Sequence, residues 1–238
     1  KFTYKDTVFE IKNKEDLFSF LEKVFEETNS NSFFCKPIDG RMGQNIFVLD
    51  KNTYRNSNDK LINLILSLGF IFQDLILQHE SLNMINKFSA NTLRIVTYIN
   101  KENKVEVLSG FIRLGRNGAI IDNAHAGGIV VSINKETGKM RDEGVQLMDN
   151  GGGVFYKHPD TGIIFDNFQI PYFNQVKEIV SKAATLLNFP LLGWDVAITP
   201  NGPIIVEANH DFHLFLSDRM EYGLKKNPVF NKLLQQIV

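Results

Sequence analysis

The residues with the clearest chemical potential are two carboxylates and an amide near the C-terminal end, Asp195, Glu207 and Asn209. They belong to two strongly apolar segments, 192–198 and 203–208, which predict a pair of β-strands. Carboxylate and amide oxygens are hard ligands that suit Mg²⁺, which takes one or two carboxylates together with substrate phosphates. Alternatively, the two acids are outward-facing residues of a half-solvated sheet. The apolar strands weigh against this alternative, because unpaired acids are costly there.

The turn between the two strands decides whether the three side chains share one face. Glu207 and Asn209 do so in any register, since they are two residues apart. The intervening Pro200-Asn201-Gly202 favours a three-residue loop, in which Pro and Asn form a type I turn and Gly adopts the left-handed conformation. That loop places Asp195 directly opposite Glu207. A two-residue turn would shift the register and send Asp195 to the other face.

A lysine followed by a glycine-containing loop forms a second candidate site, Lys36-Pro-Ile-Asp-Gly-Arg-Met-Gly-Gln44. The lysine ammonium and the free backbone N–H groups around Gly40 and Gly43 could surround a polyphosphate. The segment is not a Walker A loop, because no Gly-Lys-Ser/Thr follows. The alternative interpretation is a plain hairpin turn with a surface lysine.

Two arginines stand in apolar segments that predict successive strands, Arg94 in 92–99 and Arg113 in 105–114. Arginine is seldom buried without an anionic partner. A structural ion pair or an exposed position on a one-sided sheet would explain either residue alone. The occurrence of two such strands in succession favours an anion-binding site.

The composition excludes several classes of protein. The 238 residues carry a net charge of −1, so no basic excess attracts nucleic acid or an anionic membrane. The single cysteine, Cys35, excludes an intrachain disulfide and a cysteine-based zinc site. Residues 1–31 do not form a secretory signal, and the apolar run 61–72 is too short to span a bilayer. We therefore expect a cytoplasmic protein without membrane insertion.

The elements that must position these groups are short strands with flanking helices. Antiparallel strands and flanking helices predict the α+β class. We expect the polar segment 142–168 to be a mobile loop with little regular structure. The predicted helices lie at 17–25, 59–68, 171–187 and after Pro228, and the further predicted strands at 32–37, 45–49, 70–77 and 120–133.

In their joint order these segments resemble the ATP-grasp superfamily, and most closely the sugar-transfer associated ATP-grasp family, which is tied to bacterial cell-surface polysaccharide synthesis. The resemblance runs from about Ser32 to the end of the chain. The segments that carry it are Phe34-Cys-Lys-Pro with its glycine loop, Gln73-Asp-Leu-Ile-Leu-Gln-His79, Ser89-Ala-Asn-Thr-Leu-Arg94, Asp122-Asn-Ala-His-Ala-Gly-Gly128, His158-Pro-Asp-Thr-Gly162, and Gly193-Trp-Asp through Glu207-Ala-Asn209.

The resemblance implies an ATP-grasp fold in which ATP lies between two α+β lobes, here 1–76 and 77–238. It implies that Lys36 contacts a phosphate beneath the Gly40–Gly43 loop. Arg94 and Arg113 match positions that meet the phosphates or a substrate carboxylate. The remaining implied contacts are Gln73, Asp74, Leu75 and Ile76 around adenine, Gln78 or His79 near the ribose, Asn123 with Gly127 and Gly128 on the phosphate side, and Asp195, Glu207 and Asn209 as magnesium ligands.

The implied reaction activates a carboxylate as an acyl phosphate, which an amine then attacks, with ATP and Mg²⁺ as cofactors. A sugar or sugar-linked acid is the expected partner substrate. A kinase on the same fold and a non-catalytic nucleotide-binding module of a polysaccharide assembly are the alternatives. Only 31 residues precede the first implied ATP-binding strand. The usual further N-terminal domain is therefore expected to be absent, with its contacts supplied by a partner chain or a missing segment.

Overall fold

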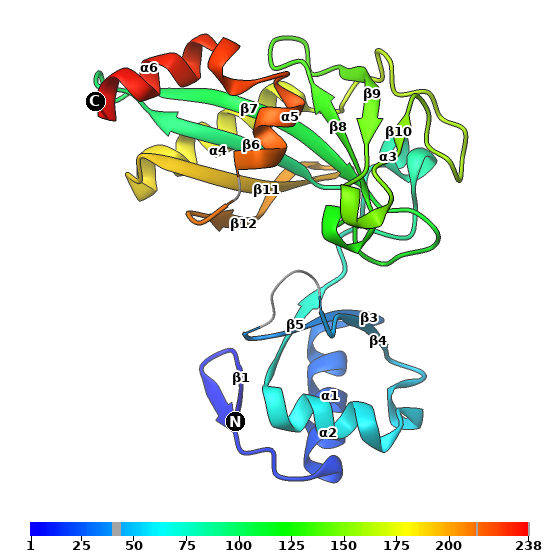
Figure 1. The fold of residues 1–238 in the computed structure, drawn as a ribbon. Helices are drawn as coiled ribbons and strands as arrows, with labels where there is room; N and C mark the ends of the chain where they lie inside the picture. Colours follow the sequence, from blue (N-terminus) through cyan, green and yellow to red (C-terminus); the bar gives the residue numbers. More distant parts are fainter. Residues whose placement is uncertain (40–43, 213, 238) are drawn as a thin grey trace. The chain divides into compact units, whose positions relative to one another are not determined.

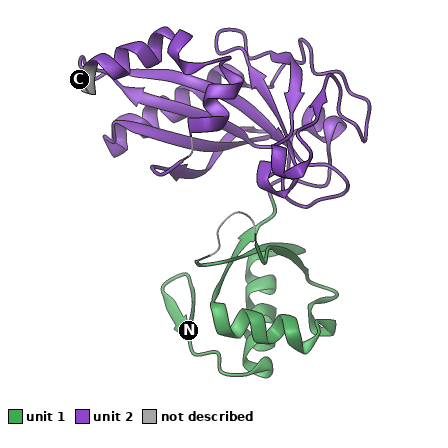
Figure 2. Ribbon diagram, in the orientation of Figure 1, with its two compact units in different colours: residues 1–75 green, residues 76–238 purple. Residues whose placement is uncertain are grey.

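The computed structural model describes residues 1–39, 44–212 and 214–237 (Figure 1). The described chain forms two compact units, Lys1–Leu75 and Ile76–Val238 (Figure 2). Both combine helices with antiparallel strands, so the predicted α+β class is confirmed. No helix in the described ranges has the length and hydropathy that a bilayer crossing requires.

Unit 1 packs two helices against one face of a small antiparallel sheet with strand order β4-β3-β5. The amide of Asp16 donates to the side-chain oxygen of Asn13, which caps the first helix as its sequence predicts. Gly69, at φ +69°, ends the second helix. The elements are β1 (Phe2–Tyr4), β2 (Thr7–Phe9), α1 (Lys14–Thr28), β3 (Ser32–Pro37), β4 (Phe47–Asp50), the 3₁₀ turn Tyr54–Asn56, α2 (Asp59–Leu68) and β5 (Phe70–Asp74).

The two faces of the unit 1 sheet differ in exposure. Phe33 and Cys35 of β3 point into the core with the helices, whereas Phe34 and Lys36 lie on the opposite, partly exposed face. The predicted buried strand 70–77 is shorter than expected, because it ends at Asp74 and only its first residue is buried. An edge strand with one uncovered face explains this exposure.

Unit 2 is built on a seven-stranded sheet in the order β10-β9-β8-β7-β6-β11-β12, in which every neighbouring pair is antiparallel. Helices α3 and α4 cover one face, and α5 and α6 pack on the other. The elements are α3 (Glu80–Ile85), β6 (Leu93–Ile99), β7 (Val105–Leu114), β8 (Ile129–Ile133), β9 (Met140–Val145), β10 (Val154–Phe155), α4 (Phe173–Leu187), β11 (Leu191–Thr199), β12 (Gly202–Asn209), α5 (Leu214–Met220) and α6 (Pro228–Ile237), with 3₁₀ turns at Ala124–Ala126, Met148–Asn150 and Leu224–Lys226.

Segment 142–168 corrects the prediction of a loop with little regular structure. Its first residues complete β9, its middle forms β10, and an antiparallel bridge joins Lys157 to Ile164. Phe165 and His158 are fully buried. β10 and the bridge involve only one or two residues on each side and lie among glycines and polar residues. Segments this short show no hydrophobic periodicity, so the sequence did not predict their pairing.

Candidate functional site

The β11–β12 hairpin places the three predicted oxygen ligands on one face. Asp195 pairs with Glu207, and Gly193 pairs with Asn209. The predicted pairing is confirmed, but the predicted three-residue loop is not, because Thr199 pairs with Gly202 and leaves a two-residue turn. The register then shifts between Asp195 and Val196, where the neighbouring partners are Glu207 and Ile205. The extra residue of this β-bulge restores the alignment that the turn alone would have lost.

Four strands that are neighbours in the sheet, β7, β6, β11 and β12, contribute charged residues to this face. Arg94 of β6 lies directly opposite Asp195 of β11, and its Nε donates to Oδ1 at 2.5 Å. Arg113 of β7 shares the face, because Phe111, two residues earlier, is the register partner of Arg94. Its Nη2 donates to Asp195 Oδ2 at 2.8 Å. Each oxygen of this carboxylate therefore accepts one guanidinium N–H.

The charged row is nearly closed to solvent. Asp195 is 6% exposed, and the side chains of Arg94 and Arg113 are 15% and 14% exposed. Burial disfavours ionisation of Asp195, but Arg113 and Arg94 outweigh it and hold the pKa of this carboxyl below its usual value. Burial likewise opposes the charge of Arg113, and Asp122 and Asp195 more than compensate, so the pKa of Arg113 is raised. The site is thus a set of fixed charges at neutral pH.

A second buried carboxylate, Asp122, belongs to the same cluster and was missed by the sequence analysis. Its Oδ2 accepts hydrogen bonds from the backbone amide and the hydroxyl of Thr92, each at 2.6 Å. Arg113 Nε lies 3.7 Å from the same oxygen. The only sequence signal was its place in the segment 122–128, where an acid next to Asn123 resembles an ordinary turn.

The donor set fits Mg²⁺ bound jointly by protein and phosphates. Both oxygens of Asp195 retain a lone pair beyond those used by the arginines, and Glu207 is exposed. The Nδ2 atom of Asn209 is buried and lacks a hydrogen-bond partner within the described ranges. Among those residues no group of three or more His, Cys, Asp or Glu side chains could hold a metal. Oxygen donors supplied partly by substrate therefore suit this site better than an all-protein metal cage does.

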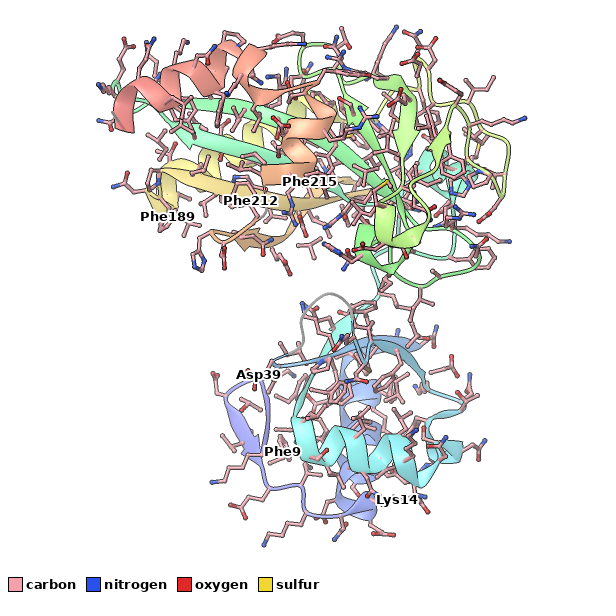
Figure 3. The ribbon with its side chains drawn as sticks, viewed as in Figure 1. Phe9, Lys14, Asp39, Phe189, Phe212 and Phe215 are labelled. Carbon is pink, nitrogen blue, oxygen red and sulfur yellow. The ribbon has the colours of Figure 1, made fainter. Side chains whose placement is uncertain are left out.

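The glycine at 193 lets neighbouring groups approach the hairpin closely. A Cβ at this position would lie 3.1 Å from the ring of Phe212 and 3.3 Å from Cδ of Arg94. Phe212 follows β12 in the chain and lies beside the hairpin (Figure 3). The missing side chain thus leaves room for the guanidinium stem that reaches Asp195.

The loop that carries Asn123 is held by side chains from another part of unit 2. The side-chain oxygen of Asn123 accepts from the amide of His125, which caps the turn Ala124–Ala126. Gln146 donates to the carbonyl of Gly127, and Asn150 donates to the carbonyls at 124 and 125. Asn123 directly follows Asp122, so this pinned loop joins the charged cluster.

The unit 1 candidates lie on the uncovered sheet face. Lys36 pairs in register with Ile71, and Gln73 pairs with Phe34, so all four share that face. Asp74 points the other way, and its carboxylate accepts a hydrogen bond from Ser30 at 2.6 Å. Leu75 and Ile76 follow the strand without regular structure. Gly40 and Gly43 lie outside the described residues.

Gln78 and His79 have internal roles. The amide of Gln78 donates to Asn83 and to the carbonyl of Asn86, and its oxygen accepts two N–H groups of Asn91. All four of its hydrogen-bonding positions are used, which leaves none for a ribose. The Nδ1 atom of His79 contacts the amide and hydroxyl of Ser81 and caps α3.

Comparisons with known proteins identify the family of the chain. Residues 4–227 match the family described as Sugar-transfer associated ATP-grasp. No curated protein matches the chain. Similar solved structures include the biotin carboxylase domain of a Hydrogenobacter thermophilus 2-oxoglutarate carboxylase with MgADP and bicarbonate, at 11% identity and a TM-score of 0.48, covering 88% of this chain and 36% of that one.

Two further structures are similarly distant. An N5-carboxyaminoimidazole ribonucleotide synthetase with ADP has 12% identity and a TM-score of 0.47, covering 82% of this chain and 38% of that one. The ATP-grasp ligase PsnB with Mg, ADP and a precursor variant has 13% identity and a TM-score of 0.47, covering 92% and 49%. The chain thus spans between about a third and a half of the length of these proteins.

The expected family resemblance is therefore confirmed over nearly the whole sequence. The matched residues include the β11–β12 hairpin, both arginine-bearing strands and the uncovered face of unit 1. This chain belongs to the sugar-transfer associated ATP-grasp family.

Proposed function

We propose that the chain binds ATP with Mg²⁺ and catalyses carboxylate–amine ligation through an acyl phosphate, in the modification of a cell-surface polysaccharide or its sugar precursors. The observation that carries the proposal is the row Arg113, Arg94, Asp195 and Glu207 across four consecutive strands, with Asn209 at its end. Phosphoryl transfer requires mainly positioned charges around the transferring group. The row supplies both signs of charge, and all of its members except Glu207 are largely buried.

Asp195, Glu207 and Asn209 would hold Mg²⁺ in this proposal. When bound, the metal would supply positive charge that offsets the charge of the phosphates. Arg94 and Arg113 have N–H groups beyond those given to Asp195, and these would contact the transferring phosphoryl group or the substrate carboxylate. Asn123, Gly127 and Gly128 would lie on the phosphate side of the site, although the amides of residues 125–128 donate within the loop itself.

Unit 1 would contribute the nucleotide contacts. Lys36 stands among partly exposed apolar residues on its sheet face, including Phe34, Val48 and Ile71. An ammonium group on an apolar surface suits a phosphate next to a flat aromatic base. Residues 73–76, which end β5 and follow it, would offer backbone groups to adenine.

The chemistry needs no side-chain nucleophile. A substrate carboxylate oxygen would attack the γ-phosphorus of ATP and release ADP, and an amine would then attack the acyl carbon and release phosphate. The one cysteine does not compete as a nucleophile, because burial raises the pKa of the Cys35 thiol to about 12. The arginines would stabilise the charge that develops on the phosphoryl oxygens.

Calorimetric titration of ATP and ADP, with and without Mg²⁺, tests the proposal on the wild type and on Glu207→Gln. We expect magnesium-dependent nucleotide binding that Glu207→Gln weakens at least tenfold, which corresponds to about 1.4 kcal/mol. Glu178→Gln is the matched control, because Glu178 is an equally exposed acid on α4, the helix on the other face of the sheet. Absence of binding at millimolar nucleotide would refute the nucleotide site in this chain.

Product analysis then tests the reaction class. With a screen of sugar-linked acids and amines, a ligase releases inorganic phosphate only when both substrates are present. A stable phosphoester product would instead identify a kinase and overturn the ligase assignment.

A further inference from the structure

Asp122 is a buried acid that the proposed reaction does not itself use. It is 9% exposed and lies just after the partly exposed segment 115–121 that follows β7. Both of its close hydrogen bonds come from Thr92, through the backbone amide and the hydroxyl. A buried charge with such a concentrated set of donors holds its neighbours in a defined place.

The Thr92 hydroxyl links this acid to Arg113. Arg113 directs Nε and Nη2 to Thr92 Oγ1, at 3.1 and 2.5 Å. A guanidinium only donates and a carboxylate only accepts, so the single hydroxyl proton must point to Asp122 while the oxygen accepts from Arg113. Arg113 Nη2 also donates to Asp195. The result is a directed chain from Asp195 through Arg113 and Thr92 to Asp122.

The charges along this chain balance. Burial raises the pKa of Asp122, and Arg113 and the two Thr92 hydrogen bonds act against that rise. When Asp122 is ionised, Arg94 and Arg113 face Asp195 and Asp122, which leaves Glu207 as the additional negative charge on the same sheet face. Without Asp122, both guanidinium charges would fall on Asp195 alone. A carboxylate whose negative charge already faces two guanidinium groups attracts a metal ion only weakly.

The backbone next to Asp122 is adapted to this position. A Cβ on Gly128 would lie 2.4 Å from the carbonyl oxygen of Asp122 and 3.0 Å from that of Asn123. Only glycine permits this close approach, and the amide of Gly128 donates to the carbonyl of Asn123. The loop backbone therefore packs closely against Asp122, beside its contact with Thr92.

We propose that Asp122 is a positioning residue, which orients the Arg113 guanidinium through the Thr92 hydroxyl and shares its charge so that Asp195 stays available to a metal ion. The inference rests on the proposed function only in assigning Arg113 to the phosphoryl group. The orientation of Arg113 itself is a property of the unliganded chain.

The first test measures that orientation without nucleotide. The Nε–Hε resonance of Arg113, identified by its disappearance in Arg113→Lys, should exchange slowly with water in the wild type and in Thr92→Ser. Thr92→Val removes the hydroxyl at constant volume and should accelerate this exchange at least tenfold. Equal protection in Thr92→Val and Thr92→Ser would overturn the proposal.

The second test measures the consequence for binding. Thr92→Val should weaken magnesium–ATP about tenfold, whereas Thr92→Ser should stay within twofold of the wild type. Thr185→Val is the control, because Thr185 is an exposed helical threonine whose hydroxyl donates to the carbonyl of Ser181 in its own helix. Equal weakening by Thr92→Val and Thr92→Ser would show that the hydroxyl is not responsible and would overturn the proposal.

Asp122→Asn covers the case in which Thr92→Val fails to fold. Both Thr92 hydrogen bonds and the Arg113 contact go to the same oxygen, Oδ2, so the amide oxygen can still accept from Thr92, but the negative charge that Arg113 faces is lost. Rapid exchange of Arg113 Nε–Hε in this variant is the expected result, and unchanged exchange would overturn the proposal. If the wild type binds no nucleotide, the function proposed above fails, while the exchange experiment still decides the role of Asp122.

Discussion

Replacement of Asp195 by asparagine should destabilise unit 2 by removing the shared partner of two buried arginines. The side chain of Asp195 is 9% exposed and accepts one N–H from each arginine, at 2.5 and 2.8 Å. Breaking a buried ion pair by removing one partner costs about 3–5 kcal/mol. Asparagine keeps one acceptor oxygen, so the lower end of that range, about 3 kcal/mol, is expected.

The single tryptophan makes this effect measurable in unit 2 alone. Trp194 adjoins Asp195, is 1% exposed, and donates its ring N–H to Thr97 at 2.7 Å. Denaturant unfolding followed by Trp194 fluorescence therefore reports the sheet that carries the site. The exposed Asp211→Asn serves as control and should change the free energy of unfolding by less than about 0.5 kcal/mol.

The pH dependence provides a second check on the same residue. The arginines hold the pKa of Asp195 below its usual value, so its stabilising contribution is complete above the ordinary aspartate pKa of about 3.9. The contribution is lost as pH falls through the lowered value in the folded protein, where the acid becomes neutral like asparagine. The difference between wild type and Asp195→Asn should therefore shrink below about pH 4. A difference under about 1 kcal/mol at pH 7, or one that does not vary with pH, would refute the reasoning.

Three further changes test other parts of the structure. Burial raises the pKa of Cys35 to about 12, so a thiol reagent at pH 8 should label this residue at least a hundredfold more slowly in native than in denatured protein. Because the thiol ionises more readily in the unfolded chain, the free energy of unfolding should fall through this residue only as pH rises above about 9. Gly193→Ala should lower the free energy of unfolding by about 1–3 kcal/mol in the Trp194 assay, because its methyl group meets Phe212 and Arg94; an unchanged midpoint would contradict this crowding. Gln78→Ala should lower the free energy of unfolding, measured by calorimetry, by about 2–4 kcal/mol, because Asn91 and Asn83 lose their hydrogen-bond partner. The exposed Gln73→Ala should change it by less than about 0.5 kcal/mol, and equal effects of the two substitutions would reject the internal role of Gln78.

The hairpin shows how far sequence reasoning reached. The two-residue spacing of Glu207 and Asn209 on an apolar strand was sufficient to place these two side chains on one face. The correct pairing with Asp195 was obtained from an incorrect turn, since the structure has a shorter loop and compensates with a bulge. A bulge depends on neighbouring strands, here the simultaneous pairing of β11 with β6, and has no local sequence signature.

The polar residues were harder to interpret from the sequence. An ion pair and an anion site were offered as alternatives for Arg94 and Arg113, yet the structure pairs both with the same carboxylate that was chosen as a metal ligand. Gln78 resembled a ligand contact because it belongs to the family-like motif 73–79, and only its burial among Asn83 and Asn91 reveals a structural role. Such assignments depend on which side chains the fold brings together.

The strand order of unit 2 also has a consequence for how the protein folds. The arginine strands β6 and β7 are neighbours in sequence, but Asp195 arrives 101 residues after Arg94 and 82 after Arg113. Closing so long a loop is slow compared with forming a hairpin. Two positive charges therefore lie side by side on a nascent sheet, where Asp122 can face Arg113 early, but the carboxylate that both arginines share reaches them only when β11 docks. Assembly of the charged row thus coincides with the docking of β11, so a chain that has not finished folding lacks the assembled charged face.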